Sequence, residues 1–436
     1  MTVITDNPSQ YGAATALASH EHDIDPSSID PRALEVVDAL HAAGFQALLV
    51  GGCVRDLLLG MQPKDFDVAT DATPEEVRKV FRRSRIIGRR FRIVHVRFGR
   101  DIIEVSTFRK GLKHHEIELA HTRKDLKGST AARSSQGVLL RDNTFGSLDE
   151  DALRRDFTIN ALYYDPRTET LAEFADGLSD LDARCLRLIG NPVQRFREDP
   201  VRILRAIRFA AKLGFEIESE TESAIPETVE LIGEIPAARL FDEIIKLLLC
   251  GCAERSWQLM RQYGLTELLF PSLKDHRLPE LAMLSTDARV AQGKPVTPGF
   301  IYAVLLWPGY LARCTYYATS MPLPQARNIA CNEIIAEQQP VISIPRRFSQ
   351  FIRDVWTLQP RLERRQPRSI EKLLAHPKFR AAYDFVLLRA EAGEVPTALA
   401  DWWTDIQVVP AQQRSDKIRS LKPSKRKRSR PKDRQA

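Results

Sequence analysis

Apolar residues follow two different spacings in the first 110 positions of the chain. From Pro31, the helical spacing of Leu34, Val37 and Leu40 predicts a helix that stops near Gly44. Short apolar and β-branched runs then predict strands, with helical stretches between them. The predicted strands are 47–50, a run around 66–68, 90–98 and 102–108, and the predicted helices are 53–60 and 74–83.

The pattern changes after residue 108. Residues 109–148 are polar and aperiodic, which predicts a mobile loop, and 149–162 is helix-like before a strand at 163–166. Helical spacing dominates from Val201 to about Phe270 and again over 298–390. We therefore expect an α+β protein with a mixed α/β head followed by helices. The expected parts are a disordered leader (1–30), the head (31–190), a helical neck (191–260), a helical body (261–410) and a basic disordered tail (411–436).

Charge is concentrated at the end of the chain. Residues 417–436 hold ten Lys or Arg and one Asp, a local charge of +9 against a total of +7, so residues 1–416 carry −2. A basic block with Pro and Ser stays disordered and binds polyanions by releasing counterions, although a solvated tail or a nuclear localisation signal has the same composition. The residues expected to hold RNA are Lys425, Arg426, Lys427, Arg428 and Arg430.

Composition excludes several protein classes. With 43% hydrophobic residues the 436-residue chain can bury a core, and it has no apolar stretch of about 18 residues to insert in a membrane. Six scattered cysteines do not make a disulfide framework, and the polar, acidic start does not resemble a signal peptide. These features predict a soluble, cytoplasmic protein. Zinc spacings, Rossmann and Walker glycine patterns and a hydrolase G-x-S-x-G are absent.

Two carboxylates, Asp65 and Asp67, stand one residue apart in PKDFDVAT. Residues i and i+2 of a strand share a face, so such a pair repels itself unless a cation lies between them. Mg²⁺ prefers oxygen ligands and is usually shared with substrate phosphates. Alone, the pair also fits a solvated turn.

The setting of the pair favours the metal. Gly51 and Gly52 follow a buried strand and open a helix, which presents backbone N–H groups to an anion, and Arg55 lies one turn further on. A phosphate cradle beside a metal-binding pair is what nucleotidyl transfer requires.

A third carboxylate is expected from a neighbouring segment, and two candidates remain open. Glu104 lies on a predicted strand, where burial without a cation or partner is costly. Asp156 lies beside Arg154 and Arg155. Each also fits an ordinary salt bridge.

The segment REDPVRILRAIRF predicts a helix with a polar and an apolar stripe. Its polar residues recur every three positions, and Glu198 and Arg202 have the spacing of an ion pair on a surface helix. A carboxylate beside a guanidinium also presents an acceptor and donors that can imitate the edge of a base. The polar residues at this spacing are Asp199, Arg202, Arg205 and Arg208.

Seven segments together resemble one known family over about residues 45–250. They are, in chain order, GGCVRDLLLG, DFD, IIEVSTFR, RRDFTINAL, DGLSDL, LRLIG and REDPVRILRAIRFAAKLGF. This order is similar to that of the class II nucleotidyltransferases, which comprise tRNA CCA-adding enzymes and bacterial poly(A) polymerases. The resemblance implies a polymerase β-like head, two Mg²⁺ ions, ATP as substrate and RNA 3′ ends as partners.

The resemblance also implies roles for single residues. Asp65 and Asp67 resemble the metal-binding catalytic carboxylates, with Glu104 or Asp156 as the third acid. The triphosphate-binding elements correspond to Gly51, Gly52 and Arg55, and the sugar and phosphate contacts to Arg154, Arg155, Asp156 and Asn160. Asp199 and Arg202 are similar to the family's nucleotide-selecting template, and Arg205 and Arg208 are expected to bind nucleotide beside them.

Within the family, IIGRRFRIVHVRFG, the far C-terminal region and the basic tail resemble the bacterial poly(A) polymerases. The implied activity is template-independent transfer of AMP from ATP to RNA 3′ ends, which promotes RNA decay. A CCA-adding enzyme and a non-catalytic RNA-binding protein remain the alternatives.

Overall fold

The computed structural model describes residues 15–88, 92–110, 118–119, 131–133, 139–142, 144–274 and 276–421. The chain divides into two compact units, Met1–Ile235 (unit 1) and Pro236–Ala436 (unit 2). This division falls inside the predicted neck, 191–260.

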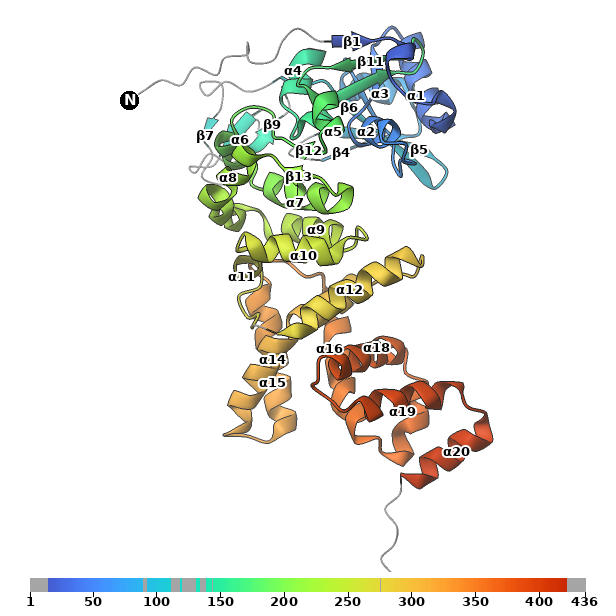
Figure 1. The fold of residues 1–436 in the computed structure, drawn as a ribbon, viewed down its shortest axis with the longest axis vertical. Coiled ribbons are helices and arrows are strands. Elements are labelled where there is room, and N and C mark those ends of the chain that lie inside the picture. The colour runs from blue at the N-terminus through green and yellow to red at the C-terminus, as the bar shows by residue number, and fades with distance from the viewer. Residues whose placement is uncertain are drawn as a thin grey trace, which may run out of the picture. The chain divides into compact units, whose positions relative to one another are not determined.

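An eight-stranded mixed sheet forms the centre of unit 1 (Figure 1), in the order β1-β11-β10-β2-β3-β6-β5-β4. Every neighbouring pair is antiparallel except β3 and β6, which run parallel. The strands are β1 (Thr15–Leu17), β2 (Ala47–Val50), β3 (Asp67–Thr70), β4 (Ser84–Ile87), β5 (Ile93–Phe98), β6 (Asp101–Thr107), β10 (Leu162–Asp165) and β11 (Thr170–Glu173).

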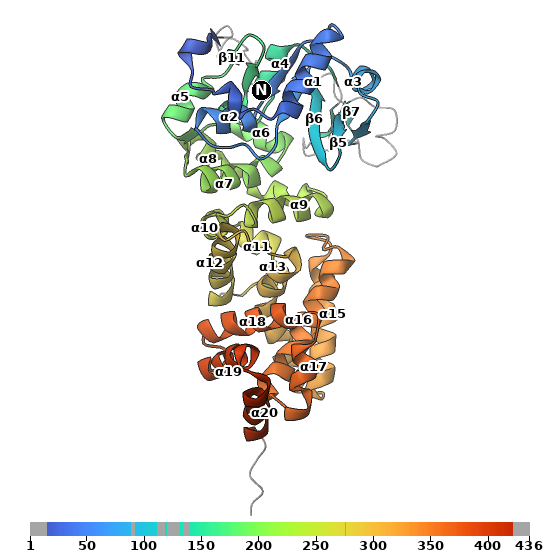
Figure 2. The same ribbon diagram turned by 90° about the vertical axis from the view of Figure 1, so that its right-hand side faces the viewer.

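Helix α1 (Pro31–Ala42), labelled in Figure 2, confirms the first predicted helix. It packs on β2 and β3. The Asp30 carboxylate caps it by accepting from the Arg32 N–H at 2.8 Å, and Pro31 occupies the first turn, where it costs no hydrogen bond. Ala33, Val36, Val37 and Leu40 are fully buried, whereas Leu34 is only partly buried. Two short helices, α2 (Gly52–Leu58) and α3 (Pro74–Val80), confirm the other helices predicted before residue 110.

The prediction of a disordered leader was wrong for residues 15–30. Strand β1 pairs with β11, and Ile24 and Ile29 are buried. The segment is mostly polar, so its few buried apolar residues form no pattern from which an ordered structure could be predicted. The edge strand β4 was not predicted, because its four residues carry no clear alternation.

The helix predicted over 149–162 was also wrong in its second half. Helix α4 (Leu148–Leu153) ends early, and a 3-10 turn, η5 (Thr158–Asn160), precedes β10. Between them Phe157 is fully buried and bridges to Leu188. A tertiary contact thus overrides the local helical spacing.

Part of the predicted loop 109–148 has regular backbone. Strands β7 (Glu118–Leu119), β8 (Ala131–Arg133) and β9 (Leu139–Asp142) form a small three-stranded sheet.

The rest of unit 1 is largely helical. The amphipathic α7 (Val201–Leu213) buries one face, as its apolar stripe predicts. The other elements are α5 (Gly177–Asp182), β12 (Cys185–Leu186), α6 (Pro192–Glu198), β13 (Glu216–Ile217), α8 (Ser219–Thr228) and η6 (Val229–Glu234).

Within the residues that the structure describes, unit 2 consists of helices and connecting segments, and no helix of either unit is long and apolar enough to cross a lipid bilayer. The elements are α9 (Ala237–Leu248), α10 (Ala253–Gln262), α11 (Leu265–Leu269), α12 (Arg277–Ala291), α13 (Pro298–Leu305), α14 (Trp307–Ala318), α15 (Leu323–Gln338), α16 (Arg346–Arg364), η7 (Pro367–Ser369), α17 (Ile370–Leu374), α18 (Phe379–Glu391), α19 (Thr397–Val408) and α20 (Ala411–Ser420).

The disordered tail was predicted to begin too early. Helix α20 lies at 411–420, and its Ile418 packs with Leu421 against a core cluster around the fully buried Trp403. The basic residues from Lys425 to Arg430 lie outside the described residues, so the structure does not test their predicted role.

We predict that Gly177→Ala destabilises unit 1. A Cβ atom at this position would lie 2.5 Å from the Thr158 carbonyl oxygen in η5, a contact that backbone must move to relieve. Overpacking of this kind costs about 1–3 kcal/mol. The measurement is chemical denaturation. Gly233→Ala is the control, since nothing lies within 4 Å of a Cβ there. Equal stabilities of the two variants would contradict the prediction.

Candidate active site

A glycine turn joins β2 to α2. Gly51 has φ 77° and ψ −126°, a conformation that a side chain disfavours, and its N–H donates to the Leu162 carbonyl at 3.2 Å. A Cβ there would lie 3.5 Å from an Arg155 guanidinium nitrogen, and one at Gly52 3.7 Å from an Arg55 nitrogen. These are ordinary contact distances, so the positive φ of Gly51, rather than lack of space, is what favours glycine in this turn.

Two carboxylates face each other at the start of β3, and the charge of a third acts on them. Asp67 is its first residue and stands in register with Glu104 of the parallel β6, so the two side chains leave the sheet on one face. Asp65 lies two residues earlier and is exposed. Burial, reinforced by the negative charges of Glu104 and Asp65, raises the pKa of Asp67 to about 6. The predicted pair is thus joined by Glu104.

Two arginines oppose this negative charge. The positive charges of Arg155 and Arg205 act to lower the pKa of Asp67, but they do not cancel the effects of burial and of the neighbouring carboxylates. The pKa of Asp67 stays raised because burial and the two neighbouring carboxylates together outweigh the two guanidinium groups.

Glu104 has a partner that the sequence did not predict. His95 faces it across the antiparallel β5–β6 pair, with His95 Nε2 at 3.0 Å from Glu104 Oε1. The Glu104 side chain is 50% exposed, so it remains open to solvent and to a ligand.

Asp156 is held differently from Glu104. It accepts hydrogen bonds from Arg205 at 2.6 Å, from Asn160 Nδ2 at 3.2 Å and from the Phe157 N–H at 2.9 Å. Burial alone would raise its pKa, but these partners keep the pKa below its usual value. Its carboxylate therefore serves to orient Arg205.

The donor set fits Mg²⁺. In the part of the chain that the structure describes, no three His, Cys, Asp or Glu side chains are gathered as a ready-made metal site. Mg²⁺ does not need one, since it is usually bound by one or two carboxylates with waters and substrate phosphates. The mutual repulsion around Asp67 is what a divalent cation between Asp65 and Asp67 would relieve.

Arg55 is buried, at 2% exposed, rather than open to solvent. Its guanidinium donates to the Asp56 carboxylate and, at 2.8 Å, to Asn160 Oδ1, and it lies 5.1 Å from the centre of the Phe209 ring. Asn160 is 5% exposed and uses its other polar atom for Asp156. These two predicted ligand contacts thus lie in a buried network beneath the glycine turn.

Arg155 is oriented by a buried pair. Its Nε donates to the Tyr163 hydroxyl at 2.7 Å and its Nη2 to Asp151 at 3.0 Å, and the same hydroxyl donates to Asp151 at 2.8 Å. Arg154 lies 3.9 Å from Asp151. The Arg155 guanidinium is fixed between the glycine turn and the carboxylates.

The helix that carries the predicted polar stripe, α7, begins after the first residue of that stripe. Asp199 has an extended backbone and precedes the helix, while Arg202 donates to Glu198 at 3.2 Å, which confirms the predicted ion pair. Arg205 and Arg208 lie on α7 with their guanidinium groups 5.6 and 4.9 Å from the centre of the Phe209 ring.

Three comparisons with known proteins bear on this site. Family models match residues 47–187 ("Poly A polymerase head domain"), 214–277 ("Probable RNA and SrmB- binding site of polymerase A") and 319–436 ("Polymerase A arginine-rich C-terminus"). Poly(A) polymerase I of Escherichia coli O157:H7 is 44% identical over 432 residues, which cover 95% of this chain and 91% of that protein.

The chain belongs to the poly(A) polymerase family.

Sequence similarity to a CCA-adding enzyme extends over a shorter part of this poly(A) polymerase family member, whereas similarity in fold extends over most of it. That of Streptococcus suis is 40% identical over 217 residues, 50% of this chain and 49% of that protein. Among solved structures, a CCA-adding enzyme of Thermotoga maritima complexed with tRNA has a TM-score of 0.57 at 20% identity, covering 89% of this chain and 85% of that one. The fold is that of a polymerase β-like nucleotidyltransferase head followed by helices.

Several residues of the site were missed in the sequence. Arg195 donates to the Arg154 and Arg155 carbonyls and, at 2.9 Å, to Glu198. Burial and the nearby Arg202 lower its pKa to about 10. In the sequence, the only signal for these interactions of Arg195 is its i, i+3 spacing from Glu198. The spacing of Asp151 and Arg155 is an equally weak signal, and nothing in the sequence pairs His95 with Glu104.

We predict that Asp67→Asn stabilises this poly(A) polymerase family member when divalent cations are chelated. Its raised pKa, about 6 against an ordinary 3.8, means that folding opposes ionisation. The substitution should raise the free energy of unfolding at pH 7 by about 1–3 kcal/mol, since one pKa unit is worth about 1.4 kcal/mol. The gain should grow as the pH rises from about 4 to about 6 and stay level above.

The measurement is denaturation at several pH values. Asp101→Asn, at an exposed position of β6, is the control and should shift stability by less than about 1 kcal/mol. A loss of stability in Asp67→Asn at pH 7 would overturn the reading of the carboxylate cluster.

Proposed function

We propose that the protein is a template-independent RNA adenylyltransferase that transfers AMP from ATP to RNA 3′-hydroxyl groups and releases pyrophosphate. The observation that carries this is the carboxylate cluster Asp65, Asp67 and Glu104 beside the Gly51–Gly52 turn, in a chain whose poly(A) polymerase relatives match it almost end to end. Tails made in this way would mark RNA for decay.

The match to poly(A) polymerases favours this activity over CCA addition. Relatives named as poly(A) polymerase I cover unit 1 and unit 2, whereas the CCA-adding enzyme of Streptococcus suis covers half of the chain. The chemistry at the carboxylates is the same for poly(A) synthesis and for CCA addition. The choice between these two activities therefore depends on the similarity of the rest of the chain.

Asp65 and Asp67 would hold the two expected Mg²⁺ ions, with Glu104 as the third acid. When bound, the metal activates the attacking hydroxyl and neutralises charge on the phosphates. Arg155 and Arg205 already oppose the negative charge of Asp67, which suits them to bind triphosphate oxygens. The buried Tyr163–Asp151 pair keeps Arg155 from turning away.

Glu104 is favoured over Asp156 as the third acid. Asp67 responds to the charge of Glu104, whereas the Asp156 oxygens are already occupied by Arg205, Asn160 and a backbone N–H. Asp156 would act by orienting Arg205 toward the nucleotide.

Asp199 and Arg202 would select the incoming base. Both lie next to the network in which Arg195 holds the Arg154 and Arg155 carbonyls, so base recognition and phosphate binding share one scaffold. Arg208 lies one turn beyond Arg205 on the same helix.

The basic tail would hold the RNA without regard to sequence. Lys425, Arg426, Lys427, Arg428 and Arg430 carry positive charge, and phosphate contacts give affinity without base specificity. A cytoplasmic location is part of the proposal, and six unpaired cysteines fit a reducing compartment.

We predict that the purified protein with Mg²⁺ extends a generic RNA into a ladder with ATP and not with CTP, UTP or GTP. Asp65→Ala and Asp67→Ala should each lower the rate by about 10²-fold or more, because each removes a charge that holds the metal. Asp101→Ala is the matched control. Gel electrophoresis of labelled RNA is the measurement.

The alternatives give different products. A tRNA that ends before its CCA, extended by CTP and then by a single AMP, would indicate a CCA-adding enzyme. RNA binding without turnover of ATP would indicate a non-catalytic protein. Either result would overturn the proposed activity.

We predict that Glu104→Gln lowers the reaction rate, whereas Asp156→Asn lowers stability. Glu104→Gln should lower the rate by about 10²-fold with stability unchanged, since its side chain is half-exposed. Asp156→Asn should lower the free energy of unfolding by about 1–3 kcal/mol, because it weakens a buried charged hydrogen-bond network. Denaturation and single-turnover rates separate the two. Full activity of the Glu104→Gln variant would show that Glu104 is not the third catalytic acid.

A further inference from the structure

The Arg195 side chain links two parts of unit 1 to which the proposed function assigns one nucleotide. It belongs to α6 and is only 14% exposed. Its Nη2 donates to the Arg154 and Arg155 carbonyls, and its Nη1 donates to the Glu198 carboxylate at 2.9 Å. A planar guanidinium can donate in several fixed directions at once, so this single side chain ties α6 to the segment between α4 and η5.

The phosphate-binding side of this link is Arg155. Its positive charge acts on Asp67, and its guanidinium is oriented by the Tyr163 and Asp151 side chains. The contact with Arg195 uses the Arg155 carbonyl and none of its guanidinium nitrogens. Arg195 therefore sets where the Arg155 backbone lies relative to α6 without occupying the group that would bind phosphate.

The base-selecting side of the link lies at the end of α6. The Arg195 carbonyl accepts from Arg202 Nη1 at 2.7 Å and from the Asp199 N–H at 3.2 Å. Glu198 Oε2 accepts from Arg195 Nη1 at 2.9 Å and from Arg202 Nη1 at 3.2 Å. The backbone of Arg195 thus contacts both residues proposed to select the base, and its side chain shares a carboxylate with one of them.

We propose that Arg195 is a positioning residue that keeps the Asp199–Arg202 pair at a fixed distance from Arg155, so that the preference for ATP over CTP depends on it. This inference rests on the proposed function, in which Asp199 and Arg202 read the base while Arg155 binds the triphosphate. The base and the triphosphate of one nucleotide are joined covalently, so the groups that bind them must keep a fixed separation. A misplacement of about 1 Å between such groups can cost about 100-fold in rate.

The surroundings of Arg195 are not those that stability alone would favour. Burial, together with the positive charge of Arg202, lowers its pKa to about 10, and its Nε is buried without a hydrogen-bond partner among the described residues. A buried polar atom with no partner costs free energy, and buried ionic groups can often be replaced by apolar ones of similar volume without loss of stability. The contacts of Arg195 are therefore better explained by the positions that they fix than by stability.

The test measures extension of a labelled generic RNA in Mg²⁺ with ATP alone and with CTP alone. The readout is the ratio of kcat/KM for ATP to kcat/KM for CTP. Arg195→Met keeps the length of the side chain but removes its donors, and it should lower this ratio by about 10- to 100-fold. Arg195→Lys keeps the charge but lacks the planar fork of donors, so its ratio should lie between those of the wild type and Arg195→Met.

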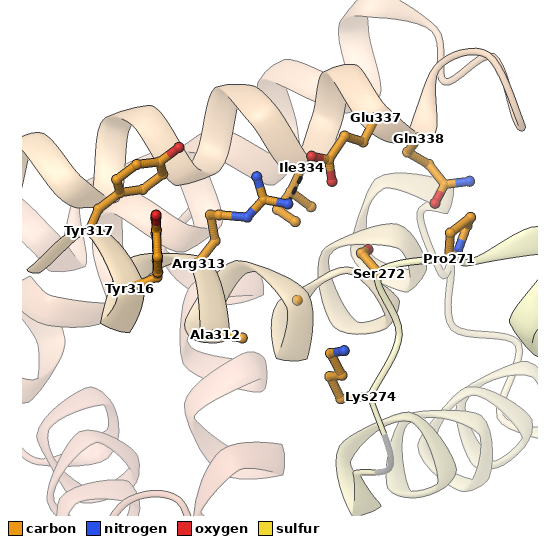
Figure 3. Close-up of a pocket in the computed structure, with 11 residues that line it drawn as sticks. Pro271, Ser272, Lys274, Ala312, Arg313, Tyr316, Tyr317, Ile334, Glu337 and Gln338 are labelled. Atoms are coloured by element: carbon orange, nitrogen blue, oxygen red, sulfur yellow. Dashed lines mark hydrogen bonds and ion pairs between the residues drawn. The ribbon is translucent and has the colours of Figure 1, made fainter.

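The matched control is Arg313→Met in unit 2. Arg313 donates to Glu333 and Glu337, each at 2.8 Å, and so links α14 to α15; Figure 3 shows it beside Glu337. It is thus a comparable arginine link that lies outside the residues assigned to catalysis. Its loss should leave the ratio within about twofold of the wild-type value, because any change in RNA affinity enters both terms of the ratio.

An unchanged ratio in both Arg195 variants would overturn the proposal, because a purely structural link would lower kcat/KM for ATP and for CTP by the same factor. Denaturation of each variant shows whether it is folded under the assay conditions, and if Arg195→Met is not, Arg195→Lys decides.

Failure of this inference is distinct from failure of the proposed function. A wild type that makes poly(A), while its Arg195 variants keep the wild-type ratio, refutes the positioning role alone. A wild type that makes no tails refutes the proposed function.

Discussion

Strands β3 and β6 run in parallel and set the Asp67 and Glu104 carboxylates side by side, where they repel each other. Burial, together with this repulsion, keeps the pKa of Asp67 high even with Arg155 and Arg205 near it. Ionisation of Asp67 therefore opposes folding. The glycine turn, the buried arginines and α7 are all arranged around that charge.

Four arginines of unit 1 fall into two groups that differ in burial. Arg55 and Arg195 are buried and donate to carboxylates, an amide or carbonyls, so they tie α2, α6 and the segment before η5 together. Arg155 and Arg205 are partly exposed and oriented by Asp151 and Asp156. A buried guanidinium with several fixed acceptors is a rigid link, and such links fix the segments that carry the more exposed arginines.

Unit 2 ties a buried guanidinium to carboxylates in the same manner. Arg389 is buried and pairs with Glu363 and Glu394, and Gln359 also accepts from it. Several buried polar atoms of unit 2, among them Gln338 Oε1, the Ser272 hydroxyl and the Tyr302 hydroxyl, have no hydrogen-bond partner among the described residues.

The sequence by itself determined the α+β order of elements, the helix at 31–42, the Asp65–Asp67 pair, the Glu198–Arg202 ion pair and the family. These follow from local spacing and from residue types that persist along a short stretch. Only the tertiary structure decided that Glu104 rather than Asp156 joins Asp67, that Arg55 is buried, and that residues 15–17 complete the sheet. Strand register and long-range packing bring together residues tens of positions apart, and no local periodicity encodes which of two acids will face a third.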